Sequence, residues 1–223
     1  MTYLVRRGVA ELVGTAFLAT AVIGSGVMAQ RLSPTDVGLQ LLENSLATGG
    51  ALAALILAFG VVSSAFNPVV TALDVALGRL WLAEGVVLIL AQLLGGCLGA
   101  VAANLTFELP AVTISTRHRA SEAHIVAEIV ASVGLLLVID GTLRRNRLET
   151  VAVGVAGYIT AAYWFTSSTS FANPAVTVAR TLTDTFAGIS PASAGLFVLA
   201  QGAGGVLAFF LIRLLHPQGV SHA

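Results

Sequence analysis

Apolar residues form long runs along almost the whole chain, and short polar segments separate them. Six runs have the length of about 20 residues that an α-helix needs to cross a bilayer core. They lie roughly over residues 8–29, 44–62, 81–105, 125–143, 150–165 and 192–215. The pattern predicts a polytopic all-α membrane protein. No polar segment is long enough for a separate soluble domain, so we expect one transmembrane domain over residues 1–223.

Two further apolar segments are too short to span a membrane, and both begin with Asn-Pro. Asn67-Pro68-Val69 follows the second run, and Asn173-Pro174-Ala175 follows the fifth. Asn is a good helix N-cap and Pro suits the first helical turn. A helix that starts at membrane depth needs a polar cavity at its open N-terminus. We therefore expect two half-helices, ending near residues 78 and 188, that meet at one site.

The two halves of the chain repeat each other. Glu11 in the first run matches Glu128 in the fourth. In each half, an Asn-Pro follows the second of its three runs. The third and sixth runs share Leu-Ala-Gln with a pair of glycines, around Gln92 and Gln201. Three spans per repeat is an odd number, so the second copy must be inverted in the membrane. The repeats cover roughly residues 8–105 and 124–216.

The distribution of charged residues gives information about the orientation of the protein in the membrane, and little about binding partners. The formal net charge is zero and only 10% of residues are charged, so nothing favours a nucleic-acid partner. Six spans place both termini on one side of the membrane. Seven arginines would then lie on the side of the termini and four on the other, which favours cytoplasmic termini. The seven are Arg6, Arg7, Arg79, Arg144, Arg145, Arg147 and Arg213.

The twin Asn-Pro signatures, with the paired glutamates and glutamines, resemble the aquaporin (major intrinsic protein) family. The resemblance implies six tilted helices and two half-helices, assembled as a homotetramer with a pore in each protomer. It implies a passive channel in a lipid bilayer, without cofactor or catalysis. Residues 107–112 and 173–188 resemble a bacterial aquaglyceroporin branch linked to arsenic resistance, which implies the bacterial inner membrane. The implied solutes are water, glycerol-like molecules and uncharged arsenicals such as arsenite or neutral organoarsenicals.

The pore residues that the resemblance implies begin with Asn67 and Asn173. Their amides would donate hydrogen bonds to permeating water and interrupt a proton wire, helped by about half a positive charge at each half-helix N-terminus. Pro68, Val69, Pro174 and Ala175 complete the signatures. The family's spacing places the selectivity filter at Thr48, Ala161, Ser170 and Val176.

This sequence departs from the family pattern at the filter. Val176 stands where Arg is usual, and Thr177 stands where glycerol channels usually carry Asp. Small uncharged side chains predict a wide filter that admits glycerol-sized neutral solutes and still excludes Na⁺ and K⁺. The alternative is that Phe66, Tyr163 or Phe171 leans in and leaves an ordinary water or glycerol facilitator.

Arg180 has two possible roles at this stage. It lies one helical turn beyond Val176, so its side chain can curl back toward the filter. The interpretation that the sequence favours is an ion pair with Asp184, four residues further on.

Glu11 and Glu128 are ionisable residues inside spans, which are rarely without a role. The family resemblance implies that each carboxylate holds backbone N–H groups of the loop before a half-helix; the alternative is a proton relay. A secondary transporter would also use inverted repeats and broken helices, but the half-helices here carry Asn and Val instead of ionisable residues. No catalytic constellation and no metal-ligand spacing is present, so we expect neither an enzyme nor a metal site.

Overall fold

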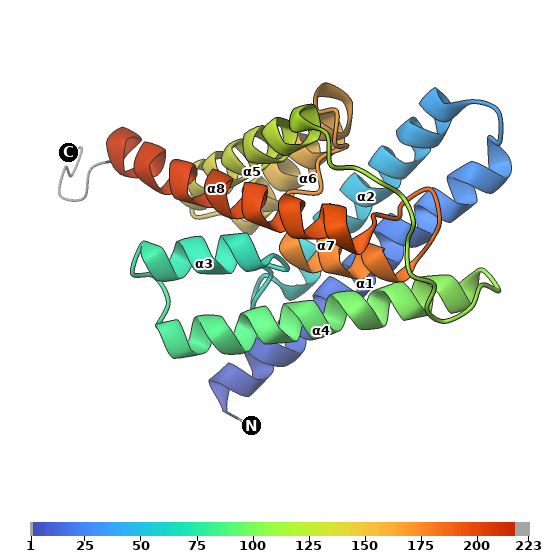
Figure 1. The fold of residues 1–223 in the computed structure, drawn as a ribbon. Helices are drawn as coiled ribbons and strands as arrows, with labels where there is room; N and C mark the ends of the chain where they lie inside the picture. Colours follow the sequence, from blue (N-terminus) through green and yellow to red (C-terminus); the bar gives the residue numbers. More distant parts are fainter. Residues whose placement is uncertain (1, 217–223) are drawn as a thin grey trace.

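The computed structural model describes residues 2–216 and is all-helical over that range (Figure 1). The six long helices are apolar enough to cross a membrane, and two short helices lie between them, so the expected fold is confirmed. The elements are α1 (Tyr3–Leu32), α2 (Val37–Phe59), α3 (Pro68–Ala76), α4 (Leu82–Thr106), α5 (Glu122–Leu143), α6 (Leu148–Phe165), α7 (Pro174–Ala179), the 3₁₀ turn η1 (Arg180–Leu182) and α8 (Pro191–Leu215).

Two boundaries differ from the sequence-based expectation. Helix α2 begins at Val37, seven residues before the expected start, because Asp36 caps it: its side chain accepts a hydrogen bond of 2.9 Å from the backbone N–H of Leu39. Helix α7 ends at Ala179 instead of near residue 188. Beyond η1 the chain turns back, and the N–H of Ile189 donates to the carbonyl of Arg180 at 3.2 Å.

The long helices pack in two equivalent pairs, α1 with α4 and α5 with α8. Glycines allow both crossings to be close. A Cβ added at Gly99 of α4 would lie 2.2 Å from the carbonyl oxygen of Ala16 on α1, and one at Gly204 of α8 would lie 2.8 Å from the Cβ of Ser132 on α5. In a bilayer, where apolar burial offers little drive for helix association, such small-residue contacts hold helices together.

The half-helices lie in the middle of this frame with their N-terminal ends toward each other (Figure 1). Helix α3 packs against α4 and α8, and α7 also packs against α4 and α8. The chain thus brings segments from its two halves to one central place, as an inverted repeat requires.

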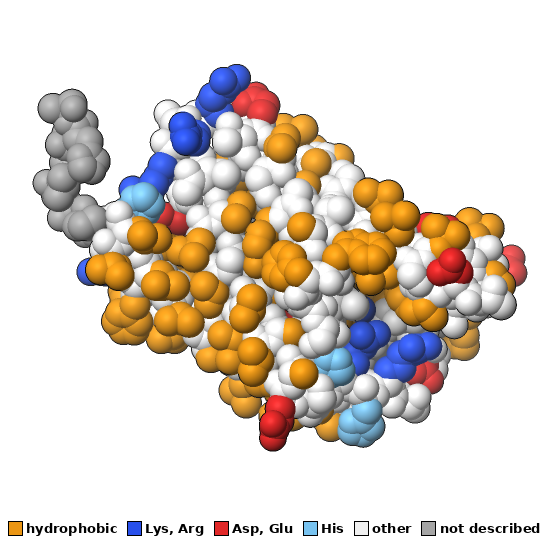
Figure 2. Space-filling model, turned by 90° about the horizontal axis from the view of Figure 1, so that it is seen from above, with side chains coloured by type: hydrophobic (Ala, Val, Ile, Leu, Met, Phe, Trp, Pro, Cys, Tyr) orange, Lys and Arg blue, Asp and Glu red, His pale blue; other side chains and the backbone are white. Residues whose placement is uncertain are grey.

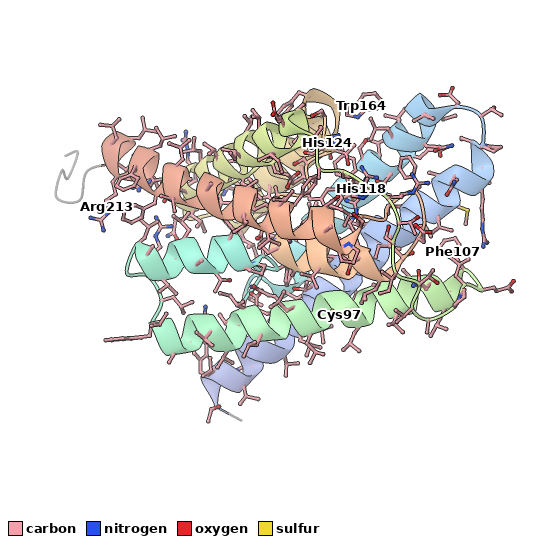
Figure 3. The ribbon with its side chains drawn as sticks, in the orientation of Figure 1. Cys97, Phe107, His118, His124, Trp164 and Arg213 are labelled. Carbon is pink, nitrogen blue, oxygen red and sulfur yellow. The ribbon has the colours of Figure 1, made fainter. Side chains whose placement is uncertain are left out.

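The molecule has two distinct ends. At the terminal end, Tyr3 and Arg7 share a cavity with Asp74 and Arg79, and Arg213 of α8 also lies there (Figure 3). At the loop end, the segment 113–117 forms backbone hydrogen bonds with residues 181, 182 and 190, and His118 lies on this side (Figure 3). Orange apolar side chains cover the middle of the face in Figure 2, while charged side chains gather toward its ends. This distribution suits a bilayer around the middle of the molecule.

Candidate functional site

Each Asn of the two signatures caps its own half-helix. The side-chain oxygen of Asn67 accepts a hydrogen bond of 3.0 Å from the N–H of Val69. The side-chain oxygen of Asn173 accepts from Ala175 at 3.0 Å and from Val176 at 3.3 Å. Capping engages the oxygen and leaves the two amide protons of each side chain for other partners.

One of those protons crosses to the opposite repeat. Nδ2 of Asn67 donates to the carbonyl of Ala172 at 2.8 Å, and Nδ2 of Asn173 donates to the carbonyl of Phe66 at 2.8 Å. Phe66 and Ala172 both have positive φ, 49° and 44°, so each loop is bent in the left-handed region just before its Asn. The reciprocal pair of bonds fixes the two half-helices against each other and leaves one proton on each amide.

Buried carboxylates hold the two bent loops. Glu11 and Glu128 are both fully buried, and neither lines the central cavity. Glu11 accepts hydrogen bonds from Ala65 N at 2.9 Å, Phe66 N at 2.7 Å and Gln92 Nε2 at 2.8 Å. Glu128 accepts from Phe171 N at 2.9 Å, Ala172 N at 2.9 Å and Gln201 Nε2 at 2.6 Å. These contacts favour the structural role over a proton relay, because charged acceptors matched to several donors are strongly stabilised.

Two adjoining cavities lie between the terminal end and the signatures. The vestibule at the terminal end has a volume of about 410 Å³, and the smaller central cavity has about 50 Å³. Both asparagines line the central cavity. Five residues line both spaces: Leu52, Ala65, Val70, Ile139 and Val155. A buried water needs roughly 10–15 Å³, so the central cavity has room for a few waters.

Three of the four expected filter residues line the central cavity. Thr48, Ser170 and Val176 are all buried there, and the hydroxyl oxygen of Ser170 has no hydrogen-bond partner among residues 2–216. Ala161 is the exception and is corrected: it lies on the exposed outer face of α6. The residue of α6 that lines the cavity at this level is Tyr163, whose hydroxyl lies 3.1 Å from that of Thr48.

The reason for the correction is helix rotation. Residues 161 and 163 point in directions about 200° apart on an α-helix. A count along the sequence that is off by one or two residues therefore exchanges an outward residue for an inward one.

An aromatic ring and a charge also line the cavity, so the filter is neither uncharged nor built only of small side chains. Phe171 and Arg180 both face it. The guanidinium carbon of Arg180 lies 3.4 Å from the centroid of the Phe171 ring. The expected ion pair with Asp184 is absent from the described residues: Asp184 instead accepts from the N–H of Thr116 at 3.0 Å.

From the sequence, a charge from Arg180 and an aromatic ring such as Tyr163 or Phe171 in the filter were only the alternatives to a wide, uncharged filter. A usable signal for Arg180 was its spacing of four residues from Val176, which places both on one face of a helix. For Tyr163 and Phe171 the signal was weaker, because nothing local separates an aromatic residue in a pore from one that faces lipid.

Comparisons with known proteins agree with this architecture. The family model of the major intrinsic proteins matches residues 1–150. The chain is 44% identical over 216 residues to the aquaglyceroporin AqpS of Rhizobium meliloti (strain 1021), covering 96% of this chain and 92% of the relative. Its fold is similar to the X-ray structure of the aquaglyceroporin from Plasmodium falciparum, with a TM-score of 0.75 at 20% identity over 97% of this chain and 98% of that one. The chain therefore belongs to the major intrinsic protein family, whose members are membrane channels and not enzymes.

Proposed function

We propose that this protein is a passive channel for small neutral solutes: water, glycerol-like molecules and uncharged arsenicals. The observation that carries the proposal is the pair of asparagines, Asn67 and Asn173, which line one central cavity that shares five lining residues with the vestibule of the terminal end. A pore needs groups that replace part of a solute's hydration, and each asparagine keeps one amide proton for that purpose.

The asparagines act on water as donors. A water molecule that accepts hydrogen bonds from both amides turns its own protons away from the pair, toward its neighbours on either side. A proton wire requires neighbouring waters to be aligned in one direction, so the reorientation interrupts it. Pro68, Val69, Pro174 and Ala175 serve this arrangement by starting the two half-helices at the correct depth.

The filter residues support solutes larger than water. Thr48 and Ser170 offer hydroxyl groups, while Val176 offers an apolar surface without charge. Uncharged arsenite resembles a small polyol in shape and hydrogen bonding, so a filter suited to glycerol-like molecules also suits it. The 44% identity to a relative called an aquaglyceroporin supports the same class of solute. Tyr163 and Phe171 limit the width, and this makes a water-selective pore the alternative outcome of the test.

The proposed setting is a bacterial inner membrane, with both termini in the cytoplasm and the chain assembled as a homotetramer. The bacterial relative supports the membrane. The excess of arginine at the terminal end supports the orientation.

The test is osmotic flux into proteoliposomes, followed by stopped-flow light scattering. Glycerol and arsenous acid are the solutes, and wild type is compared with Val176→Arg and Val176→Leu. Val176 is 4% exposed and lines the cavity, so an arginine there adds length and a second charge beside Arg180. The leucine variant is the matched control, because it adds one methylene without charge.

We expect both solutes to enter wild-type vesicles fast. Val176→Arg should reduce the rate of entry about tenfold or more, and Val176→Leu should reduce it much less. A tenfold change corresponds to about 1.4 kcal/mol in the barrier. Rapid water flux with no solute entry in any variant would contradict the proposal and identify a water channel.

A further inference from the structure

We propose that Arg180 is the residue that excludes cations from this pore, and that it also donates hydrogen bonds to oxygen atoms of the permeating solute. The inference rests on the proposed channel function and adds to it a residue that controls charge selectivity. Arg180 begins η1, four residues after Val176, and reaches the same cavity as Val176 and Ser170.

The position of the guanidinium is fixed from two sides. Its Nε donates a hydrogen bond to the carbonyl oxygen of Ala187, and its central carbon lies over the ring of Phe171, 3.4 Å from the centroid. The Arg180 backbone carbonyl is held in turn by the N–H of Ile189. Arg180 is only 3% exposed. A planar guanidinium stacked on an aromatic ring and bonded through Nε presents its two terminal nitrogens in a defined direction.

Those terminal nitrogens are available to the pore. Among residues 2–216 they make no hydrogen bond and no salt bridge. They are also not among the fully buried polar atoms that lack a partner, so they keep some accessible surface. Glu128 does not neutralise them by contact, because its carboxylate is engaged by the N–H groups of Phe171 and Ala172 and by Gln201.

Two less buried arginines that also make fixed contacts behave differently. Arg79 is paired with Asp74 and Asp140 at the terminal end. Arg119, whose guanidinium lies 5.6 Å from the Phe171 centroid, donates from Nε to Gly188 O at 2.9 Å and from Nη2 to Phe186 O at 3.0 Å. Arg119 thus stabilises the segment at residues 186–188 at the loop end, and it does not line the central cavity. Arg180 is the arginine that combines burial, a fixed orientation and an open face toward the cavity in the described part of the chain.

The physical consequence is charge selectivity. A fixed, unneutralised positive charge beside a narrow and mainly apolar cavity repels a cation with an energy several times the thermal energy, and screening by water is weak there. A neutral solute meets no such repulsion. Its oxygen atoms can accept hydrogen bonds from the guanidinium, which compensates for water lost at the constriction.

The experiment measures two properties of the same purified protein, one in proteoliposomes and one in planar bilayers. Solute entry is followed by light scattering with glycerol, and cation conductance is recorded in planar bilayers with NaCl and KCl. The variants are Arg180→Leu, Arg180→Lys and Arg213→Leu. Arg213 is the matched control because its guanidinium also lies over a ring, 4.8 Å from the Phe209 centroid, but it is exposed and outside the central cavity.

We expect Arg180→Leu to raise cation conductance about tenfold or more, as expected when a nearby unscreened charge is removed. Arg180→Lys should restore exclusion, since it keeps the charge, and should carry glycerol more slowly, since it loses the planar fork. Arg213→Leu should behave as wild type in both measurements. If the Na⁺ and K⁺ conductance of the Arg180→Leu channel is as low as that of wild type, the inference is wrong.

A second variant covers the case in which Arg180→Leu does not fold. Arg180→Met keeps an unbranched chain over Phe171 and carries the same expectation of cation leak. The two proposals fail in different ways. Absence of glycerol entry in wild type refutes the proposed function, whereas normal glycerol entry with unchanged cation exclusion in the leucine and methionine variants refutes only the role of Arg180.

Discussion

Val176 and Arg180 share one face of the second half-helix and divide the properties of the constriction between them. Val176 supplies a small apolar wall, and Arg180 supplies the charge from one turn further along. The guanidinium of Arg180 lies against the ring of Phe171, 3.4 Å from its centroid, whereas Val176 lines the cavity with a short apolar side chain. The size and the charge of the filter can thus be altered separately by mutation.

At the residue scale, Tyr163 is predicted to limit the width of the filter. Tyr163→Ala should raise the permeability to glycerol relative to water by about fivefold, the effect of roughly 1 kcal/mol on the barrier. Tyr163→Phe keeps the ring and loses only the hydroxyl contact of 3.1 Å with Thr48, so its permeability ratio should stay close to that of wild type. Stopped-flow scattering with water and glycerol gradients gives the ratio. Equal ratios in the alanine and wild-type channels would show that Tyr163 does not set the width.

At the scale of elements, the two bent loops and the half-helices after them form one bonded unit. Glu11 and Glu128 hold the loops from behind, and Asn67 and Asn173 bind each loop to the other repeat. The unit depends on the long helices that carry the glutamates, so the packing of α1 on α4 and of α5 on α8 controls the geometry of the pore.

The close crossing of α1 and α4 leads to a stability prediction. Gly99→Ala places a Cβ 2.2 Å from the carbonyl oxygen of Ala16, so the helices must separate. Overpacking of this kind costs about 1–3 kcal/mol. We expect a lower midpoint of thermal unfolding in detergent, together with slower solute flux.

The control for this prediction is Gly195→Ala on α8, where an added Cβ meets nothing within 4 Å. Alanine there should leave the unfolding midpoint unchanged or raise it slightly, because it favours the helix. A Gly99→Ala protein as stable as the Gly195→Ala protein would contradict the role of the crossing.

At the scale of the whole molecule, charge distinguishes the two ends. The terminal end carries an ion-pair group in which Asp140 of α5 binds Arg79, from the turn after α3, and Arg144, whose Nε lies 2.9 Å from the carboxylate. His216, just beyond α8, lies 3.9 Å from the same carboxylate. This group joins the mouth of the vestibule to the ends of two long helices.

The orientation in the membrane can be tested by labelling. In a Cys97→Ser background, Ala120→Cys places a thiol in the exposed loop end, and Arg145→Cys places one at the exposed terminal end. With cytoplasmic termini, an impermeant maleimide should label position 120 in intact cells and position 145 only after permeabilisation. The reverse pattern would invert the proposed topology.

Much of the fold could be predicted because its signals are local. Length and apolarity identify a spanning helix, Asn-Pro marks a half-helix, and the repeated glutamates and glutamines reveal the inverted symmetry. Capping is also local, yet the early start of α2 behind Asp36 was missed because the polar residues near it suggested a longer loop.

The sequence by itself therefore determined the spans, the two half-helices, the paired asparagines and the family. Only the tertiary structure decided which side chains share the constriction. Tyr163 replaced Ala161 there because the rotation of α6 depends on its packing, and a shift of two residues turns a side chain by about 200°. Arg180 entered because the carbonyl of Ala187, on the segment that turns back after η1, and the ring of Phe171, from before the half-helix, together fix its side chain. The contact of Tyr163 with Thr48 joins two helices far apart in the chain, and the contacts of Arg180 depend on how the chain turns back after η1. Neither has a signature in the hydrophobic pattern, and together they set the width and the charge of this pore.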